Sequence, residues 1–302
     1  MEADLSLELS KENYKPVFET AKIARTISIF LGTCTICILI TGIFSLKLYQ
    51  LDSFYIKNPD PRLSINFFFV AYLPFNSTPI ITYMTVLSAQ FYVSVISTGI
   101  HLVLDSFVVM LVLHTCGQLG VLQESLALLC ACGNDKSDFG TGNFRRAFQK
   151  IFIKHQAIGR FTRNLDSLFN FTWFPELFSC TLTLCCQGYI VQKLGRGDQS
   201  SMWQIGFPLC STLGLVTQFF LNCWAGEYLT SQSAEIGYAY YRNEWYTLKS
   251  SDARLFLMIG YQATRPSTLS TWKFSILSLR LFLQVMKASF SYLSMLLVIT
   301  DS

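Results

Sequence analysis

Acidic and histidine side chains inside apolar stretches are the residues of this chain that could take part in chemistry. Asp105 lies deep in a long apolar stretch, and His101 precedes it by one helical turn. A carboxylate inside a membrane is costly unless it has a partner, so it marks a candidate functional site. Either His101 pairs with Asp105, or Asp105 forms a hydrogen bond to a neighbouring helix and fixes packing. Glu176 follows Pro175, and we interpret this pair as a helix kink with a satisfied polar group.

The rest of the sequence contains no set of residues typical of an enzyme or a metal site. It has no P-loop, no glycine-rich dinucleotide turn and no His-Glu-x-x-His motif. Its three histidines are spread over positions 101, 114 and 155. Cys34 and Cys37 lie in an apolar stretch without a nearby His or carboxylate, so we interpret them as small helix-packing residues. We therefore expect neither an enzyme nor a bound cofactor.

Apolar stretches of membrane length must position these residues. Charged residues make up 14% of the chain, against about 25% in soluble domains, and hydrophobic residues make up 51%. Five stretches reach the length of roughly 20 residues that a bilayer-crossing helix needs. We predict an all-α polytopic membrane protein that forms a single membrane domain over residues 1–302. The predicted spans are approximately residues 26–46, 85–114, 168–192, 204–228 and 272–299.

The distribution of basic residues sets the predicted orientation. With five spans, residues 1–25, 116–166 and 230–273 share one side and carry sixteen Lys and Arg. The opposite side, which includes residues 48–88 and 193–196, carries four. Because Lys and Arg accumulate in cytoplasmic loops, the N-terminus is predicted inside and the C-terminus outside. The basic residues are spread over three loops, so the net charge of +4 does not indicate nucleic-acid binding.

Two of the predicted cytoplasmic segments have helical patterns of their own. In residues 139–166, apolar residues recur at steps of three and four, with basic residues between them, which indicates an amphipathic helix that runs into the next span. Residues 231–246 contain five aromatic residues, too many for a solvated helix face. Helices with such faces need partners, which are each other or another subunit. The alternative is that they lie on the lipid surface.

A thin polar line crosses the last apolar segment of the chain, residues 272–301. Its basic residues repeat every seven positions, so they fall near one helix face. Such a line suits a helix that borders water or packs against other subunits, because charges facing lipid are costly. After the last basic residue only about 18 Å of apolar helix remains, against about 30 Å of bilayer core, so the lower half is predicted at or below the membrane surface. The line comprises Lys273, Arg280, Lys287, Ser291, Ser294 and Val298.

Several strings, taken in their order and spacing, resemble the insect odorant receptor family. Asp105 followed by His114-x-x-x-Gln118-Leu119 is similar to the fourth helix of that family. Residues 254–271 resemble the linker before its last helix, and the match runs from about Phe18 to the end. The remaining strings resemble the family's sixth helix with the following loop, and its seventh helix. They are Cys223-Trp-Ala-Gly226, Ser231-x-Ser233, Ala239-Tyr-Tyr-x-x-x-Trp245-Tyr246 and Lys287-Ala-Ser289-Phe-Ser291-Tyr292.

The resemblance implies a membrane receptor of known type. Members of the family are odorant-gated, non-selective cation channels in the plasma membrane of olfactory neuron dendrites. They bind small volatile organic ligands and assemble as hetero-tetramers with a co-receptor. Members have seven spans, and the first span here matches the family's third. We therefore expect that two N-terminal helices are absent from this chain, as in a truncated gene model or isoform.

The resemblance also implies roles for particular residues. Aligned on Ser291 and Tyr292, the family's hydrophobic gate falls near Ser294 and Met295, in line with the polar face read from spacing; alternatively, Met295 faces a neighbouring helix. The expected pore residues are Ser291, Ser294, Met295 and Val298. The expected subunit anchor includes Trp245, Tyr246, Arg280 and Lys287. The expected apolar ligand pocket includes Leu39, Ile43, Phe44, Phe91, Tyr92 and Phe207, for each of which ordinary helix packing is the alternative.

The sequence also leaves alternative functions open. A gustatory receptor of the same superfamily would carry a Thr-Tyr…Gln-Phe string in the last helix, whereas Ser291-Tyr292 has no Gln-Phe after it. A truncated, nonfunctional receptor fragment is a second alternative. A transporter or membrane enzyme would need paired intramembrane charges or a catalytic cluster.

Overall fold

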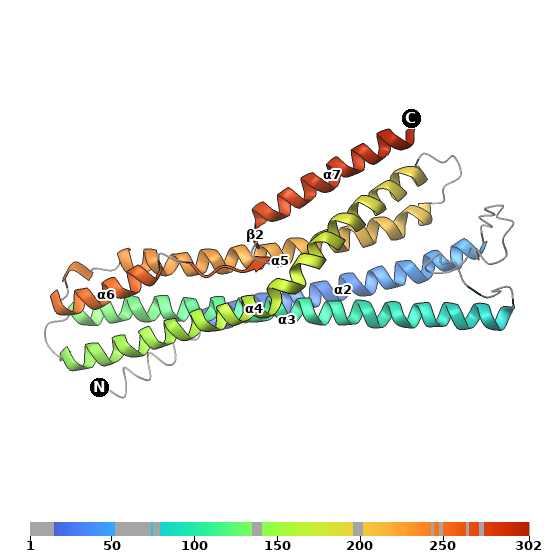
Figure 1. Ribbon diagram of the computed structural model, residues 1–302. Helices are drawn as coiled ribbons and strands as arrows, with labels where there is room; N and C mark the ends of the chain where they lie inside the picture. The colour runs from blue at the N-terminus through green and yellow to red at the C-terminus, as the bar shows by residue number, and fades with distance from the viewer. Residues whose placement is uncertain are drawn as a thin grey trace. The chain divides into compact units, whose positions relative to one another are not determined.

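Long helices make up most of the chain in the computed structural model (Figure 1). The structure describes residues 15–51, 74, 79–134, 141–195, 202–242, 245–247, 250–263, 266–271 and 275–301. A short antiparallel hairpin pairs β1 (Ser270–Thr271) with β2 (Ser275–Ile276). The prediction of an all-α fold is confirmed, with this hairpin as a small addition. The helices are α2 (Lys15–Leu51), α3 (Ile80–Asn134), α4 (Thr141–Gly195), α5 (Met202–Arg242), the 3-10 turn η2 (Trp245–Thr247), α6 (Ser250–Ala263) and α7 (Leu279–Asp301).

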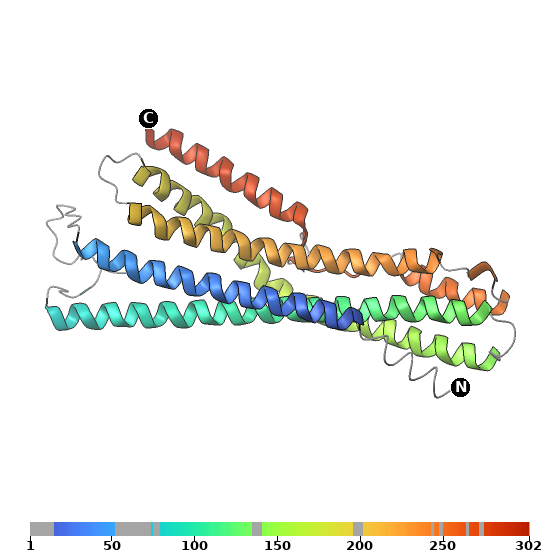
Figure 2. The same ribbon diagram turned by 180° about the vertical axis from the view of Figure 1, so that it is seen from behind.

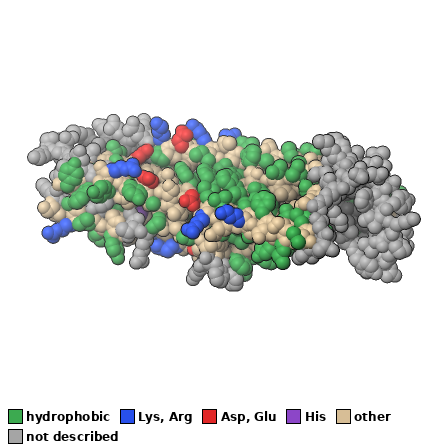
Figure 3. Space-filling model, turned by 90° about the horizontal axis from the view of Figure 1, so that it is seen from above, with side chains coloured by type: hydrophobic (Ala, Val, Ile, Leu, Met, Phe, Trp, Pro, Cys, Tyr) green, Lys and Arg blue, Asp and Glu red, His purple; other side chains and the backbone are tan. Residues whose placement is uncertain are grey.

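Three stretches of described helix are long and apolar enough to cross a membrane. They are Lys15–Gly42, Ile80–Cys130 and Leu279–Val298. One stretch of the surface in Figure 3 is covered by hydrophobic side chains with few charged ones, as expected of a surface that meets lipid. The division into five spans, and the assignment of residues 1–302 to a single membrane domain, stay predictions.

The chain folds as two compact units that share the same long helices. Unit 1 comprises Met1–Ile27, Phe107–Phe178 and Phe220–Gln284, and unit 2 comprises Ser28–Ser106, Ser179–Phe219 and Val285–Ser302. Within the described residues, the largest fully buried side chains, such as Leu113, Leu122 and Ile236, all belong to unit 1. The best-packed core of the described residues therefore lies in unit 1. Both units also expose large apolar side chains on their helices, as lipid permits.

The predicted extensions of two spans are confirmed. Helix α4 continues without interruption for 55 residues, and its first half buries Phe144, Phe148 and Leu165 while Arg145 and Lys150 are exposed. Helix α5 likewise continues from the charge-free stretch to Arg242. In Figures 1 and 2, α6 and the last part of α5 lie beside α3 and the first half of α4 within unit 1. The apolar faces of these helices thus cover one another in part.

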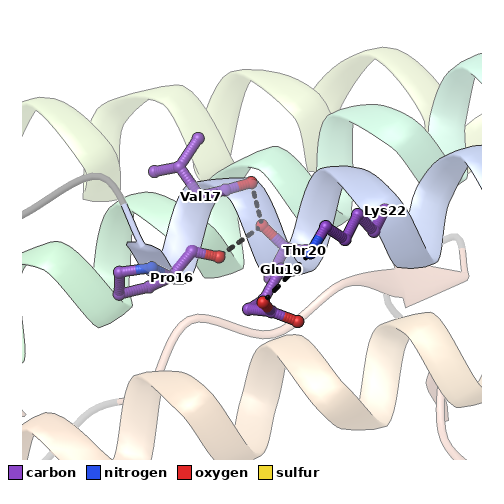
Figure 4. A network of polar contacts seen from close by, with 5 residues as sticks. All are labelled: Pro16, Val17, Glu19, Thr20 and Lys22. Atoms are coloured by element: carbon purple, nitrogen blue, oxygen red, sulfur yellow. Dashed lines mark hydrogen bonds and ion pairs between the residues drawn. The ribbon is translucent and has the colours of Figure 1, made fainter.

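The first turns of α2 satisfy their own polar groups, as Figure 4 shows. Thr20 is buried, and its hydroxyl lies 3.0 Å from the Pro16 carbonyl and 3.1 Å from that of Val17. Lys22 and Glu19 form an exposed ion pair at 3.4 Å. Because a buried hydroxyl bonded to its own helix carries no desolvation penalty for a missing partner, Thr20 can pack in the core of unit 1.

The last helix begins later than predicted. The sequence indicated one helix from Trp272, but residues 275–276 form β2 and α7 begins at Leu279. The reason is a competing local structure: the Leu277 N–H donates to the Leu269 carbonyl at 2.8 Å, which closes the hairpin instead of a helical turn. Lys273 lies outside the described residues, so the predicted polar line is observed from Arg280 onward.

Candidate functional site

Helix α7 starts from a hairpin with defined attachments in unit 1. Ser278 caps the helix: its Oγ accepts from the Leu281 N–H at 3.3 Å, and its carbonyl accepts from the Phe282 N–H at 3.1 Å. Serine is favoured at such a position because its hydroxyl satisfies a backbone donor that the first turn leaves free. The hairpin itself contacts α4 through Asp166, whose carboxylate accepts from the N–H and hydroxyl of Ser270. Position 226 of α5 passes close to Leu277.

One face of α7 is exposed along the whole helix. Its residues alternate by steps of four and three, which places them near a single line on the helix surface. The line is basic or polar in its first half and becomes less polar toward the C-terminus. The exposed fractions of Met295 and Val298 are 63% and 71%. The residues on this face are Arg280, Gln284, Lys287, Ser291, Ser294, Met295 and Val298.

The opposite face of α7 packs inward. Val285 and Ser289 are buried in unit 2, and Leu281 is buried in unit 1. In unit 2, Leu293 lies directly over Gly188 of α4: a Cβ at position 188 would come 2.8 Å from Leu293 Cδ2. The helix thus has one face held by its neighbours and one face left open, which we name the open face of α7. The packing of Val285, Ser289 and Leu293 holds the helix in unit 2 without any contact to the open face.

Two serine hydroxyls of α7, one on the open face and one on the buried face, are bonded to the helix backbone. Ser294 Oγ donates to the Ser291 carbonyl at 2.8 Å, and Ser289 Oγ donates to the Val285 carbonyl at 2.9 Å. Serines bonded in this way can border either water or a neighbouring helix, because their donor is already satisfied. The predicted pore residues Ser291, Ser294, Met295 and Val298 therefore share an exposed face.

The residues of the predicted ligand pocket lie on three helices of unit 2. Leu39 of α2 and Phe207 of α5 are half-buried. Phe91 and Tyr92 of α3 are exposed, and the exposed fraction of Tyr92 is 67%. Ile43 and Phe44 lie in α2, but their side chains fall outside what the structure describes. The structure thus places Leu39 and Phe207 partly inside unit 2 and the two α3 aromatics on its surface.

The predicted subunit anchor is on the surface of the chain. Trp245 and Tyr246 form η2 in unit 1, with ring centroids 6.4 Å apart in an edge-to-face arrangement. The exposed fraction of Tyr246 is 70%. Arg280 and Lys287 are exposed on the open face of α7. An exposed aromatic residue is available to a partner, because aromatic side chains supply a large contact area at low entropic cost.

Several polar side chains form hydrogen bonds to a side chain of a neighbouring helix. In unit 2, the Gln218 amide of α5 donates to the buried carboxylate of Asp105 on α3, and Thr212 Oγ1 donates to Gln187 Oε1 at 2.6 Å. In unit 1, Asn222 Nδ2 donates to Glu176 Oε1 at 3.4 Å. The second interpretation of Asp105, a hydrogen bond to a neighbouring helix, is thus confirmed, and so is the satisfied polar group at Glu176.

The sequence reasoning missed Gln218 and Asn222. Both lie in or beside the charge-free stretch 201–226, and they are four residues apart, so they share one face of α5. That spacing was a usable signal, because uncharged polar residues in an apolar helix need partners in the interior. Among the described residues, no group of three or more His, Cys, Asp or Glu side chains is placed to hold a metal ion.

The geometry defines a class of protein, a helical membrane protein. The exposed face of its last helix is polar near the start of the helix and apolar toward the end. Comparison with known sequences makes the class specific. The sequence model described as 7tm Odorant receptor matches residues 5–290, and the chain therefore belongs to the 7tm odorant receptor family. This confirms the resemblance read from the motifs. Members of the family are receptors, so the prediction that the chain is not an enzyme is also confirmed.

Individual relatives are distant and longer. Odorant receptor 22c of Drosophila melanogaster is 24% identical over 197 residues, which cover 64% of this chain and 48% of the relative. Odorant receptor Or2 of Anopheles gambiae is 22% identical over 217 residues, covering 71% of this chain and 56% of the relative. The chain spans about half the length of the curated relatives it matches.

Solved structures share the fold. The insect olfactory receptor OR5 from Machilis hrabei in complex with eugenol superposes with a TM-score of 0.77 at 14% identity, covering 94% of this chain and 68% of that one. A second structure of the same receptor gives a TM-score of 0.69 at 14% identity, covering 92% and 69%. At this identity the likeness establishes the helical fold, which agrees with the all-α polytopic architecture.

Proposed function

We propose that this chain is an odorant receptor subunit that binds volatile organic molecules and, with a co-receptor, forms a ligand-gated cation channel. Membership of the odorant receptor family supports the receptor part of the proposal. The observation that carries the channel part is the open face of α7. Its seven residues are all exposed within one chain, although Arg280 and Lys287 would be costly against lipid. If copies of this helix surrounded a water-filled pore, their charged residues would face water instead of lipid.

The gate of the proposed channel lies in the outer half of α7. Ser291, Ser294, Met295 and Val298 are exposed on one face, and the Ser294 hydroxyl donates to the helix backbone. A ring of Met side chains would narrow a pore and exclude water, and the flexible thioether chain could rotate aside on opening. A ligand opens the channel only if it binds the open arrangement more tightly than the closed one.

The proposed ligand pocket is apolar and aromatic. Its candidate residues belong to unit 2, where apolar side chains dominate, and a volatile ligand would be held there by shape and dispersion with few hydrogen bonds. The relative solved with eugenol is a receptor captured with one small aromatic molecule. The proposed residues are Leu39, Ile43, Phe44, Phe91, Tyr92 and Phe207.

The proposed partner is a co-receptor subunit in a hetero-tetramer at the plasma membrane of olfactory neurons. The aromatics of η2, the half-buried Trp245 and the exposed Tyr246, support a subunit contact on unit 1. Arg280 and Lys287 on the open face of α7 are the proposed polar part of the anchor. Their charge favours the cytoplasmic side of the membrane, which agrees with an N-terminus inside and a C-terminus outside.

Co-expression of the chain with an insect odorant co-receptor tests this function. The chain should reach the cell surface, measured by surface biotinylation, and a panel of volatile odorants should evoke a cation current that the co-receptor alone does not give. If the chain reaches the surface with its co-receptor and no odorant in a broad panel changes the current, the channel proposal is wrong. A current carried by the chain without co-receptor would contradict the proposed partner.

A further inference from the structure

We propose that Asp166 is a positioning residue for α7: its carboxylate holds the β1–β2 hairpin and thereby sets the resting orientation of the helix that follows. The inference rests on the proposed function, because a change in the orientation of α7 affects ion conduction only if that helix gates the proposed channel. The residues that carry it all belong to unit 1, up to the first turn of α7. We name this contact the Asp166–Ser270 clamp.

The clamp consists of short hydrogen bonds from one serine to one carboxylate. The Ser270 N–H lies 2.6 Å from Asp166 Oδ1, and Ser270 Oγ lies 2.9 Å from Oδ1 and 3.1 Å from Oδ2. Asp166 comes from α4, 104 residues before Ser270, so the contact joins distant parts of the chain. Bonds in which the acceptor is ionised are shorter and stronger than neutral ones.

The hairpin depends on such outside support. Each strand has two residues, and an isolated two-stranded hairpin is marginal in water. Two further contacts come from α5: Ser233 Oγ accepts from the Ser267 N–H at 2.9 Å, and Gly226 lets the Leu277 carbonyl approach. Among these three attachments, only the clamp comes from α4 and carries a charge. It is therefore the attachment of these three that a change of charge at a single side chain would weaken.

Very little chain separates the hairpin from α7. After β2 come only Leu277, which is buried, and Ser278, which caps the helix. A displacement of the hairpin is therefore passed to the first turn of α7 without a flexible linker. A helix of 23 residues is about 34 Å long, so a tilt of about 5° at its base moves its far end by about 3 Å.

The carboxylate also explains why aspartate suits this position. Its Oδ1 accepts from both the N–H and the hydroxyl of Ser270, and Oδ2 is a second acceptor 3.1 Å from that hydroxyl, whereas an asparagine has one, uncharged acceptor oxygen. Asp166→Asn should thus weaken the clamp and Asp166→Ala should remove it. Ser270→Ala removes the hydroxyl bonds and leaves the N–H bond in place. The three variants give a graded series at one contact, without change to the open face of α7.

The test follows the orientation of α7 directly. The full chain, expressed with its co-receptor, carries Ser294→Cys as a reporter, and its modification rate by a membrane-impermeant thiol reagent is measured against the chain without the reporter. Glu124→Gln, which changes an exposed carboxylate on α3 of the same unit, is the matched control. Asp166→Ala should change the modification rate and the odorant concentration for half-maximal current by about fivefold or more, Asp166→Asn by less.

The outcomes separate positioning from simple destabilisation. A purely structural role would lower the amount of chain at the surface and leave the modification rate of the remaining chains as in Glu124→Gln. An unchanged modification rate in Asp166→Ala overturns the proposal. If Asp166→Ala does not reach the surface, an unchanged rate in both Asp166→Asn and Ser270→Ala overturns it. Adding Ser270→Ala to Asp166→Ala should cause no further change. If the unsubstituted chain gives no odour-evoked current, the proposed function fails, while the modification rates still decide whether Asp166 positions α7.

Discussion

Gly226 of α5 lies against the backbone carbonyl of Leu277, so closely that a Cβ at position 226 would come 2.5 Å from that oxygen. The contact is between backbone and backbone, which means that neither partner can rotate away. It fixes the residue that immediately precedes the cap of α7. Glycine is therefore required at position 226 by the close approach of another segment.

Gly226→Ala should destabilise the protein, although alanine normally favours a helix. The added methyl group forces the hairpin or α5 to move, at a cost of about 1–3 kcal/mol. Gly159→Ala in α4 is the control, because a Cβ at position 159 would lie 3.9 Å from the flexible Arg163 Nη1, an ordinary van der Waals contact. That variant should be neutral or more stable by up to about 1 kcal/mol. Thermal unfolding in detergent compares them; equal melting temperatures would contradict the close contact.

The Asp105–Gln218 pair should contribute to the stability of unit 2. Asp105→Leu leaves the Gln218 amide without this acceptor, and we expect a loss of about 0.5–2 kcal/mol, as found for polar contacts between membrane helices. Asp105→Asn keeps an acceptor oxygen and should cost less. The double variant Asp105→Leu, Gln218→Leu should recover part of the loss. If the two single changes simply add, measured by denaturant unfolding, the pair does not act as one unit.

Burial lowers the pKa of Lys154 in the first half of α4. The folded state therefore disfavours the charged amine, so stability is lowest at pH values below the folded pKa and rises as the pH passes from the folded to the unfolded value. Lys154→Met should stabilise the protein at neutral pH. The gain should shrink as the pH rises toward about 10.4 and be smallest above it, where the unfolded lysine is also neutral. Exposed Lys150→Met is the control and should show no such pH-dependent gain in melting temperature.

Tyr246 should contribute to assembly more than to folding. Its ring is largely exposed and packs edge-to-face on Trp245. Tyr246→Ala should reduce co-purification with the co-receptor by about 1–2 kcal/mol of binding free energy, with little change in melting temperature. Phe18→Ala, which removes another exposed aromatic of unit 1, is the control. Unchanged co-purification after Tyr246→Ala would argue against a subunit contact at η2.

Local patterns in the sequence predict much of this fold. The helical period of Phe144, Phe148 and Leu165 predicts the buried face of α4, because the spacing of side chains on a helix depends only on near neighbours in sequence. The same holds for the open face of α7: Ser291, Ser294 and Val298 were assigned to one face from spacing alone, and all three are exposed.

Contacts between distant residues were harder to predict. His101 is the nearest candidate partner of Asp105 in sequence, but the observed donor, Gln218, lies 113 residues away. The start of α7 was wrong for the same reason, since residues 272–278 are apolar enough to extend a helix. Residues 275–276 form strand β2 instead, because Leu269, Asp166 and Gly226 offer long-range contacts that a helix would forfeit. No local pattern records those partners.

The central claim is that the open face of α7 borders the ion path, and single-channel conductance tests it most directly. Met295 and Phe290 are both 63% exposed, but they lie about 140° apart around the helix. In channels formed with the co-receptor, Met295→Ala should change the unitary conductance or the relative permeability of cations, whereas Phe290→Ala should change neither. If Phe290→Ala alters permeation and Met295→Ala does not, the conduit lies on another face and the account is wrong.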